Sequence, residues 1–251
     1  MNAFPFSQAP YRCRLDWGRR GCRAAAARGE VLVVVDTLSF STAVATAIDR
    51  GGRIYPCAPE EDAADLAARV SGVAAVGRRD VPDHGRFSLS PQTYLDMEPG
   101  TRVALASPNG GLCSRYGRGA PYLFIGALVN ARAVARAVSR VLASSGLCVT
   151  VLACGERWRA PSEDGALRMA VEDYLGAGAI LSCLEFSQSP EARVCAGAFR
   201  QAAPDLEEIL RECGSGRELQ AKGFEEDVLH AARLNLYDSV PVLRGEGIER
   251  L

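Results

Sequence analysis

The stretch VLVVVDTLSFSTA, residues 31–43, decides the fold class. Its first five residues are all valine or leucine, which predicts a strand buried on both faces of a parallel sheet. Asp36 stands directly after that strand, and four Ser or Thr residues follow it. Ligands of open α/β sheets bind outside the carboxyl ends of the strands, so polar side chains at this position predict a functional site.

Similar apolar runs recur along the first two thirds of the chain. They lie at residues 31–35, 53–57, 72–77, 102–106, 121–126 and 147–153. Segments with helical periodicity separate several of them, at 42–49, 59–70 and 128–145. Continuous apolar strands that alternate with helices indicate a mostly parallel sheet covered on both faces. We therefore expect an α/β fold of the three-layer α/β/α type.

Beyond about residue 160 the pattern changes to helices. The expected helices lie at 162–185, 191–202, 204–213 and 224–235. The final third should therefore be rich in helices that cap the sheet or form a subsidiary lobe. There is no Pro- or Ser-rich linker and no internal repeat, so residues 1–251 are expected to form a single domain. Residues 1–30, rich in Arg and Ala, are expected as an N-terminal extension, either an edge hairpin or a loose segment.

Composition excludes several classes of partner. The 29 basic and 30 acidic residues give a formal net charge of −1, so no overall field favours nucleic acid or an acidic membrane. No run of about 18 apolar residues and no secretory signal pattern are present, which predicts a cytoplasmic protein without membrane association. The nine cysteines include no C-x-x-C pair and are expected to be reduced thiols. The two histidines, His84 and His230, lack zinc-ligand spacing.

Four predicted strand ends should face one cleft, one of them followed by ALVN at 127–130 and the other three by polar loops with candidate site residues. The first carries Asp36 and begins a helix near Ser41 and Thr42, whose free backbone amides suit a phosphate. Asp36 would repel a phosphate unless a divalent cation lies between them, although an ordinary helix cap beside a solvated Asp explains this loop equally well. The second, SPNGG at 107–111, is either an ordinary turn or a loop whose backbone approaches an anion closely. The third, CGERWR at 154–159, contains Glu156 and Arg157.

Further candidates lie away from these loops. Glu172 and Asp173 interrupt an apolar helical segment, and one of them could supply a second oxygen ligand to a hard cation. The segment DHGRFSLSPQTY contributes Arg86, Ser88 and Ser90, for which an ordinary hydroxyl-rich turn is the alternative. Arginine binds oxyanions through paired hydrogen bonds, so Arg86 and Arg157 are the first choices for holding acidic groups of a substrate, with Arg217 a weaker choice.

Several segments together resemble the 2-phosphosulfolactate phosphatase family. They are VVVDTLSFSTAVATAIDRGG, GRFSLSP, SPNGG, ACGERW followed by EDGALRMAVEDYLGAGAI, and CGSGRELQAKGFEEDVLHAARLNLYDSVPVL, which occur in the family's order from about residue 31 to 243. The resemblance implies a Mg²⁺-dependent acid phosphatase that converts 2-phospho-3-sulfolactate to 3-sulfolactate and phosphate, a step of coenzyme M synthesis. It also implies the family's own α/β/α fold.

The resemblance carries functional residues onto matching positions. These are Asp36, Ser41, Thr42, Asn109, Gly110, Glu156, Glu172 and Asp173. Our hypothesis is that Asp36, with Glu172 or Asp173, holds Mg²⁺ against the phosphate while helix amides and the SPNGG backbone neutralise charge on the phosphoryl oxygens. Many members carry arginine where this chain has Ser39, so a different phosphorylated acid, or compensation by Arg86 or Arg157, is an alternative.

Two further expectations concern activity and assembly. A non-catalytic protein that keeps the fold and its anion pocket is the competing hypothesis from another functional class. The apolar, small-residue helix at 174–183 suits an interface as well as a core, and on that basis we expect a homodimer.

Overall fold

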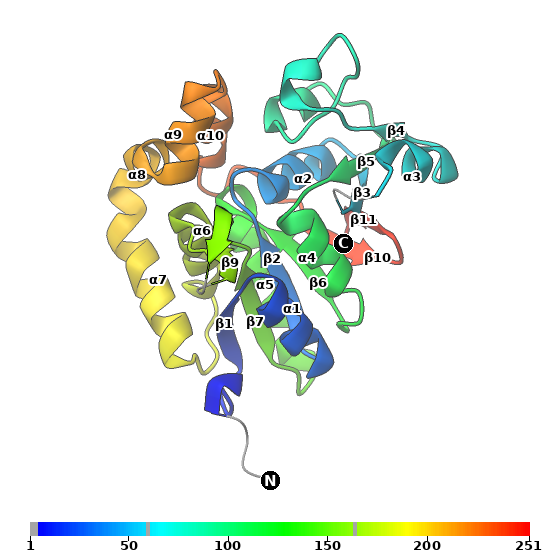
Figure 1. The fold of residues 1–251 in the computed structure, drawn as a ribbon. Helices are drawn as coiled ribbons and strands as arrows, with labels where there is room; N and C mark the ends of the chain where they lie inside the picture. The colour runs from blue at the N-terminus through cyan, green and yellow to red at the C-terminus, as the bar shows by residue number, and fades with distance from the viewer. Residues whose placement is uncertain (1–4, 59–60, 163–164) are drawn as a thin grey trace.

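The computed structural model describes residues 5–58, 61–162 and 165–251 and confirms the α/β fold (Figure 1). Within these residues a nine-stranded sheet has the order β1-β7-β2-β6-β10-β11-β3-β5-β4. The strands are β1 (Cys13–Trp17), β2 (Val31–Val35), β3 (Arg53–Cys57), β4 (Val73–Ala74), β5 (Arg102–Ala106), β6 (Leu123–Gly126), β7 (Val149–Ala153), β10 (Pro241–Arg244) and β11 (Gly247–Arg250). The apolar runs at 31–35, 53–57 and 102–106 are strands with the predicted bounds.

The sheet is mostly parallel but has an antiparallel insertion. Strands β1, β7, β2 and β6 pair in parallel, and so do β3, β5 and β4. The hairpin β10–β11 lies between these two blocks and pairs antiparallel with both. The final third is rich in helices, as predicted, but this hairpin was not expected from the sequence. The hairpin's sequence, PVLRGEGIER, is short and charged, and only Val242 and Ile248 of it belong to the core.

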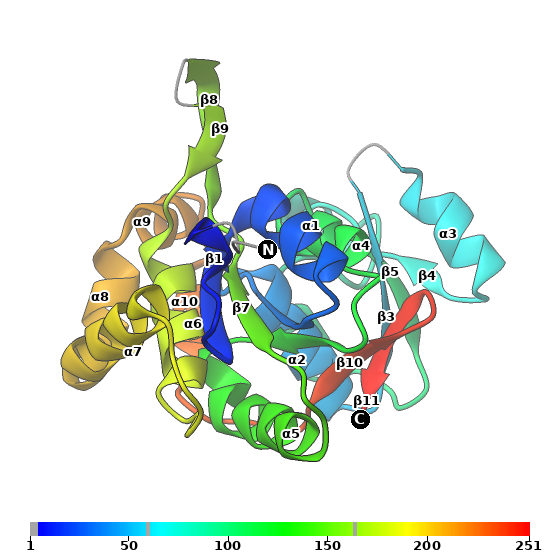
Figure 2. The same ribbon diagram turned by 90° about the horizontal axis from the view of Figure 1, so that it is seen from below.

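Helices cover both faces of the sheet, as expected for three layers (Figure 2). Alternate residues of β2 point to opposite faces. Val31, Val33 and Val35 pack in the core cluster that includes α5, α6 and α7, whereas Leu32 and Val34 pack in the cluster that includes α1, α2 and α4. The helices are α1 (Gly18–Ala27), α2 (Phe40–Asp49), α3 (Ala63–Arg69), α4 (Gly110–Tyr116), α5 (Ala131–Ser144), α6 (Val171–Leu181), α7 (Pro190–Ala202), α8 (Leu206–Glu212), α9 (Gly214–Ala221) and α10 (Glu225–Ala231). Short 3-10 helices lie at Pro5–Ser7, Arg78–Asp80, Pro91–Tyr94, Leu128–Asn130 and Ala203–Asp205.

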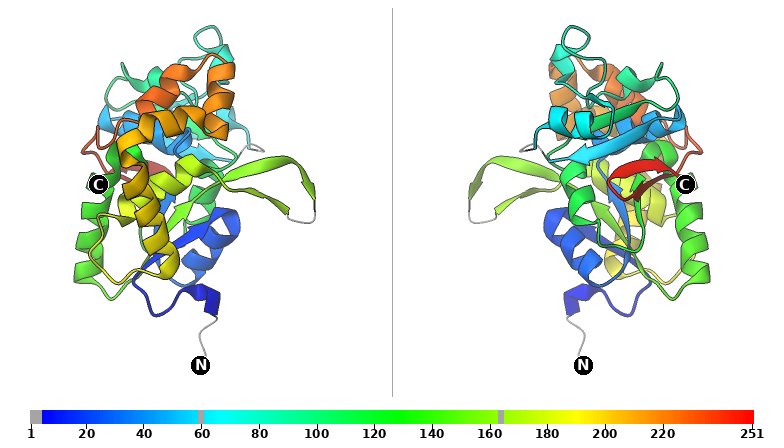
Figure 3. Two further views of the ribbon diagram at one scale, coloured as in Figure 1. Left: turned by 90° about the vertical axis from the view of Figure 1, so that its left-hand side faces the viewer. Right: turned by 90° about the vertical axis from the view of Figure 1, so that its right-hand side faces the viewer.

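Two regions differ from the sequence prediction. The N-terminal segment is neither a hairpin nor a loose extension, because β1 pairs in parallel with β7 at the sheet edge and α1 follows it. The segment predicted as the start of a helix at 162 belongs instead to a hairpin of β8 (Glu156–Ser162) and β9 (Gly165–Arg168), which projects from the body (Figure 3). Residues 163 and 164 of that prediction, and residues 59 and 60 of the predicted helix at 59–70, lie outside the described residues.

The small-residue helix α6 is packed inside this chain. A Cβ added at Gly178 would lie 2.5 Å from the backbone oxygen of Cys195 in α7, so the glycine is required for the close approach of the two helices. Leu175, Ala179 and Ile180 are also buried. The expected homodimer thus stays a prediction, and α6 is covered by its own chain. In the described parts of the chain, no helix combines the length and apolarity needed to span a membrane.

Candidate active site

The loop after β2 is shaped by its own hydroxyl groups. The backbone N–H of Asp36 donates to Ser41 Oγ at 2.9 Å, and Ser41 Oγ donates to the carbonyl oxygen of Val34 at 3.2 Å. Thr42 Oγ1 donates to the carbonyl oxygen of Thr37 at 2.8 Å. Ser41 and Thr42, predicted to contact substrate, are completely buried. Their hydroxyls hold the loop in the conformation that presents Asp36.

The carboxylate of Asp36 meets the SPNGG loop. Its Oδ2 accepts hydrogen bonds from the Gly110 backbone N–H at 2.7 Å and from Ser107 Oγ at 3.4 Å. Burial raises the pKa of Asp36 to about 7, and the nearby charge of Glu156 adds to the increase, while the Gly110 amide opposes it. A Cβ at position 110 would lie 2.8 Å from Asp36 Oδ2 and would also collide with Phe40. The loop therefore needs glycine at 110 to bring its amide onto the carboxylate.

Asp173 reaches the same region from the start of α6. Its Oδ1 accepts from the Thr37 backbone N–H at 2.7 Å, and its Oδ2 accepts from the Gly155 N–H at 2.8 Å. Burial raises the pKa of Asp173 well above its usual value, and the charges of Asp36 and Glu172 raise it further. Asp173 thus ties the first and third predicted loops together and lies close enough to Asp36 for the two carboxylates to repel each other.

Glu172 is also buried but differs in its surroundings. Its carboxylate accepts a hydrogen bond from Cys213 Sγ at 3.4 Å, and its backbone oxygen accepts from Thr37 Oγ1 at 3.0 Å. The sequence suggested that one residue of the pair supplies an oxygen ligand to a cation. Both are buried: Asp173 bridges the two loops, and Glu172 bonds to the chain just before α9.

The carboxylates can be tested as a metal site. Among the described residues, no group of three or more His, Cys, Asp or Glu side chains is arranged to hold a metal ion. Mg²⁺ usually takes only one or two protein carboxylates and fills its octahedron with waters and substrate oxygens. Asp36 and Asp173 fit that pattern because they are hard oxygen donors whose mutual repulsion a cation would relieve. Glu172, the third residue expected to bind metal, stays a prediction.

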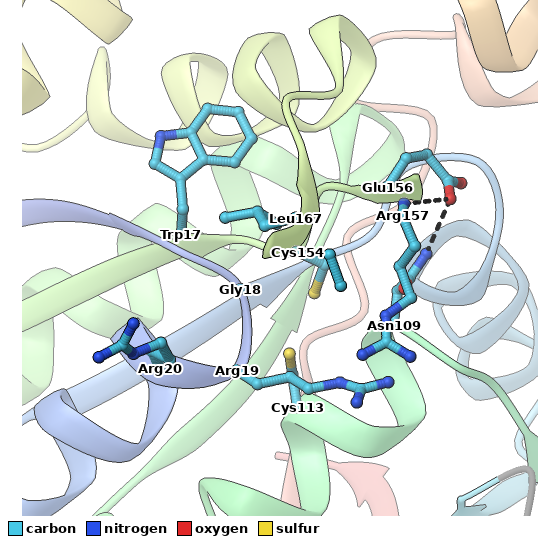
Figure 4. A pocket seen from close by; sticks show the side chains of 11 residues that line it. Trp17, Gly18, Arg19, Arg20, Asn109, Cys113, Cys154, Glu156, Arg157 and Leu167 are labelled. Atoms are coloured by element: carbon cyan, nitrogen blue, oxygen red, sulfur yellow. Dashed lines mark hydrogen bonds between the residues drawn. The ribbon is translucent and has the colours of Figure 1, made fainter. Parts of the chain in front are cut away.

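Glu156 and Asn109 meet at the edge of a cavity of about 330 Å³ (Figure 4). Asn109 Nδ2 donates to Glu156 Oε2 at 3.3 Å, and the Arg157 backbone N–H donates to the same oxygen at 3.3 Å. Burial raises the pKa of Glu156, the Asn109 hydrogen bond lowers it, and the charge of Glu172 raises it. Arg157 also lines this cavity, so three of the predicted site residues do meet.

Sequence reasoning missed two arginines that line the same cavity. Arg19 and Arg20 come from the first turn of α1, in the segment that was expected to be an extension. Arg19 Nη2 donates to the carbonyl oxygen of Pro108 at 3.0 Å and so connects α1 to the SPNGG loop. Recognising a strand at 13–17 would have placed these arginines at the cavity. That strand, CRLDW, is too short and too polar to be recognised from the sequence alone.

Arg78 was missed as well, and it contacts the first loop. Its Nη2 donates to Ser39 Oγ, and its Nε donates to Asp227 Oδ2 at 3.0 Å. Ser90 Oγ donates to the other oxygen of Asp227. Arg86 and Arg157 were considered as compensation for the arginine that many family members carry at position 39. Neither makes this contact with Ser39, whereas Arg78 places its guanidinium beside the Ser39 hydroxyl.

The remaining predicted residues are placed less directly. Arg86 is exposed, donates to the Asp96 carbonyl and lies over the Phe87 ring. Ser88 is buried, and its Oγ accepts from the Ser90 N–H at 3.1 Å. Arg217 is exposed on α9. Their roles in binding substrate stay predictions.

Sequence comparison relates this chain to known proteins. The sequence model of a family described as 2-phosphosulpholactate phosphatase matches residues 22–246. A probable 2-phosphosulfolactate phosphatase of Carboxydothermus hydrogenoformans is 32% identical over 222 residues, covering 86% of this chain and 87% of the relative. The 2-phosphosulfolactate phosphatases of Methanothermobacter thermautotrophicus and Methanocaldococcus jannaschii are 27% and 26% identical, each over 86% of this chain and over 88% and 90% of their own length. From the match over most of its length, this chain belongs to the 2-phosphosulpholactate phosphatase family.

Proposed function

We propose that this protein is a Mg²⁺-dependent phosphatase that hydrolyses 2-phospho-3-sulfolactate to 3-sulfolactate and phosphate. The observation that carries the proposal is the buried carboxylate of Asp36, which receives the Gly110 amide and adjoins Asp173 at the junction of the three predicted loops. Family membership supports the reaction type.

The roles of individual residues follow from their surroundings. Asp36 and Asp173 would hold the cation, and a cation bound there would neutralise phosphoryl charge and act as a Lewis acid. The amides of Thr37, Gly110 and Gly155 keep the two carboxylates in fixed positions by hydrogen bonding. The repulsion between these two adjacent buried carboxylates favours binding of a cation.

Glu156 is our candidate for proton transfer. It is only partly buried, its pKa is raised, and Asn109 orients one of its oxygens. A carboxyl group whose pKa is nearer neutrality exchanges protons more effectively with a water or a leaving oxygen at physiological pH. The nine cysteines are all free thiols, which supports a reducing, cytoplasmic setting for the reaction.

The proposal is tested by phosphate release from 2-phospho-3-sulfolactate, measured with Mg²⁺ and with EDTA. We expect release that requires Mg²⁺ and that is lost in Asp36→Asn. Asp205→Asn, which changes an exposed aspartate at the start of α8, is the matched control and should keep full activity. Phosphate release that persists in EDTA would count against a requirement for Mg²⁺. Activity of Asp36→Asn equal to that of the wild-type protein would count against Asp36 as part of the active site.

A different phosphorylated hydroxy acid is the alternative substrate, because this chain has Ser39 where many family members carry arginine. Parallel assays with 2-phospholactate and 3-phosphoglycerate address it, because a higher kcat/KM with either would reassign the substrate while leaving the phosphatase activity intact. Binding of all these acids without turnover would identify the non-catalytic protein.

A further inference from the structure

The cavity beside Asn109 is lined by more positive than negative charge. Arg19, Arg20 and Arg157 line it, and Glu156 is the acidic residue of its lining. One oxygen of Glu156 is already bonded to Asn109. We propose that Arg19 and Arg20, together with Arg157, form a subsite that binds a second acidic group of the substrate, a sulfonate or carboxylate, while its phosphoryl group lies at Asp36. This inference rests on the proposed phosphatase function.

The pairing of β1 explains how the N-terminal arginines reach the cavity. Trp17 lies opposite Ala153 in the β1–β7 ladder, so residue 18 begins beside the start of the CGERWR loop. Gly18 has φ +58°, a conformation that favours glycine, and the chain turns there directly into α1. The backbone at Arg19 and Arg20 is therefore positioned by the sheet. Both residues precede residue 22, where the family match begins.

Arg19 and Arg157 both place positive charge near Cys113. Hydrogen bonds with the thiols of Cys154 and Cys22 hold the pKa of Cys113 well below its usual value, and the positive charges of Arg19 and Arg157 lower it further. Cys113 is a lining residue of the cavity, and Figure 4 shows the side chains of Arg19 and Arg157 ending near one another on the same side of it. An oxyanion between the two guanidinium groups would relieve their mutual repulsion and receive paired hydrogen bonds.

The size and the position of the cavity match such a group. A volume of about 330 Å³ is at the small end of ligand sites and suits a compact acid. Trp17 and Leu167 give part of the lining an apolar character, which strengthens the attraction between guanidinium and anion by excluding water. Asn109 lines the cavity, and the next residue, Gly110, bonds to Asp36. A molecule of a few carbon atoms can therefore reach from one position to the other.

Kinetics with two substrates provide the first test. Arg19→Ala, Arg20→Ala and Arg157→Ala are each expected to raise KM for 2-phospho-3-sulfolactate roughly tenfold with little change in kcat, because each loses a charge-assisted hydrogen bond to a group remote from the reaction. KM for p-nitrophenyl phosphate, which lacks a second acid, should not change. Arg23→Ala is the matched control, since Arg23 lies on the same helix with its guanidinium over the Tyr116 ring.

Binding without turnover provides the second test. The sequence has two tryptophans, so Trp158→Phe leaves Trp17 in the cavity as the fluorescence reporter. Sulfoacetate is the probe, and its affinity should fall at least about tenfold when Arg19→Ala and Arg20→Ala are added together to Trp158→Phe. Circular dichroism of each variant checks folding, and Arg19→Lys with Arg20→Lys should retain part of the affinity.

The outcomes separate this inference from the proposed function. Unchanged sulfoacetate affinity in the double alanine variant would overturn the subsite even if the wild-type protein is an active phosphatase. Equal losses with p-nitrophenyl phosphate and the diacid would also overturn it, because the arginines would then bind the phosphoryl group. If the wild-type protein releases no phosphate, the fluorescence result alone decides: loss of sulfoacetate binding in the double variant supports the subsite, and retention refutes it.

Discussion

Asp36→Asn should make the metal-free protein more stable at pH 8 while it abolishes phosphate release. Burial raises the pKa of this carboxyl from 3.8 to about 7 in the folded protein. The folded state therefore binds its proton more tightly than the unfolded state does. The stability that this proton provides is fully present below pH 3.8 and is lost as the pH rises through 7.

The size of the effect follows from this pKa difference. Each pKa unit corresponds to about 1.36 kcal/mol, so a shift of about 3.2 units (7 − 3.8) makes the ionised carboxylate cost on the order of 4 kcal/mol at pH 8. Asparagine avoids that cost, and the stronger hydrogen bond that Gly110 makes to the ionised carboxylate is already included in this pKa. We therefore expect a net stabilisation of about 4 kcal/mol at pH 8.

Urea unfolding in EDTA at pH 5 and pH 8 measures this prediction. From pH 5 to about pH 7 the Asp36 carboxyl is mostly protonated in the folded protein but ionised in the unfolded protein. The stability of the variant relative to wild type should therefore rise by about 3 kcal/mol from pH 5 to pH 8. Added Mg²⁺ should stabilise the wild-type protein and have little effect on the variant. A stability difference that is the same at both pH values would refute the reasoning.

Three further predictions concern other residues. Gly110→Ala should lower kcat by roughly 10–100-fold, measured by phosphate release, because its methyl group displaces the amide that bonds Asp36; an unchanged kcat would contradict this. Arg78→Ala should lower the free energy of unfolding by about 3 kcal/mol in urea titrations, because Asp227 is left buried without its ion pair, and a loss below about 1 kcal/mol would contradict it. Burial lowers the pKa of His230 to about 4. Neutral His230 should therefore contribute stability above pH 6.5 that is lost as the pH falls toward 4, a change of about 3 kcal/mol in the free energy of unfolding. In acid unfolding experiments, His230→Gln should remove this pH-dependent change.

Much of the sheet and part of the site were predictable from the sequence. The strands at 31–35, 53–57 and 102–106 are buried on both faces, so nearly every residue in them is apolar and their bounds are clear. The rule that polar loops gather at the carboxyl ends of parallel strands correctly joined the loops at Asp36 and at SPNGG. The approach of the SPNGG backbone to an anion of the substrate stays a prediction, and in the structure the Gly110 amide of this loop bonds to the carboxylate of Asp36.

Other elements gave no such signal. β1 is a short edge strand with two charged residues among its five, and β10–β11 contributes one core residue from each strand. The hairpin β8–β9 projects from the body, and its residues 156–158 and 166–168 are exposed or half-buried, so the segment from 162 onward was mistaken for the start of the helix that follows. Local sequence patterns reflect burial, whereas β1 and β10–β11 are placed by backbone pairing with strands distant in the sequence.

The sequence by itself determined the α/β class, the strand that ends at Asp36 and the polar loops around it, because burial forces apolar residues into strands and leaves polar ones at their tips. Tertiary structure decided which charges reach those loops. Arg19 and Arg20 arrive through the β1–β7 register, and Arg78 arrives beside Ser39 through its contact with Asp227. An arginine has the same local pattern whether it points to solvent or into a cavity, so only the packing of distant segments gives it a partner.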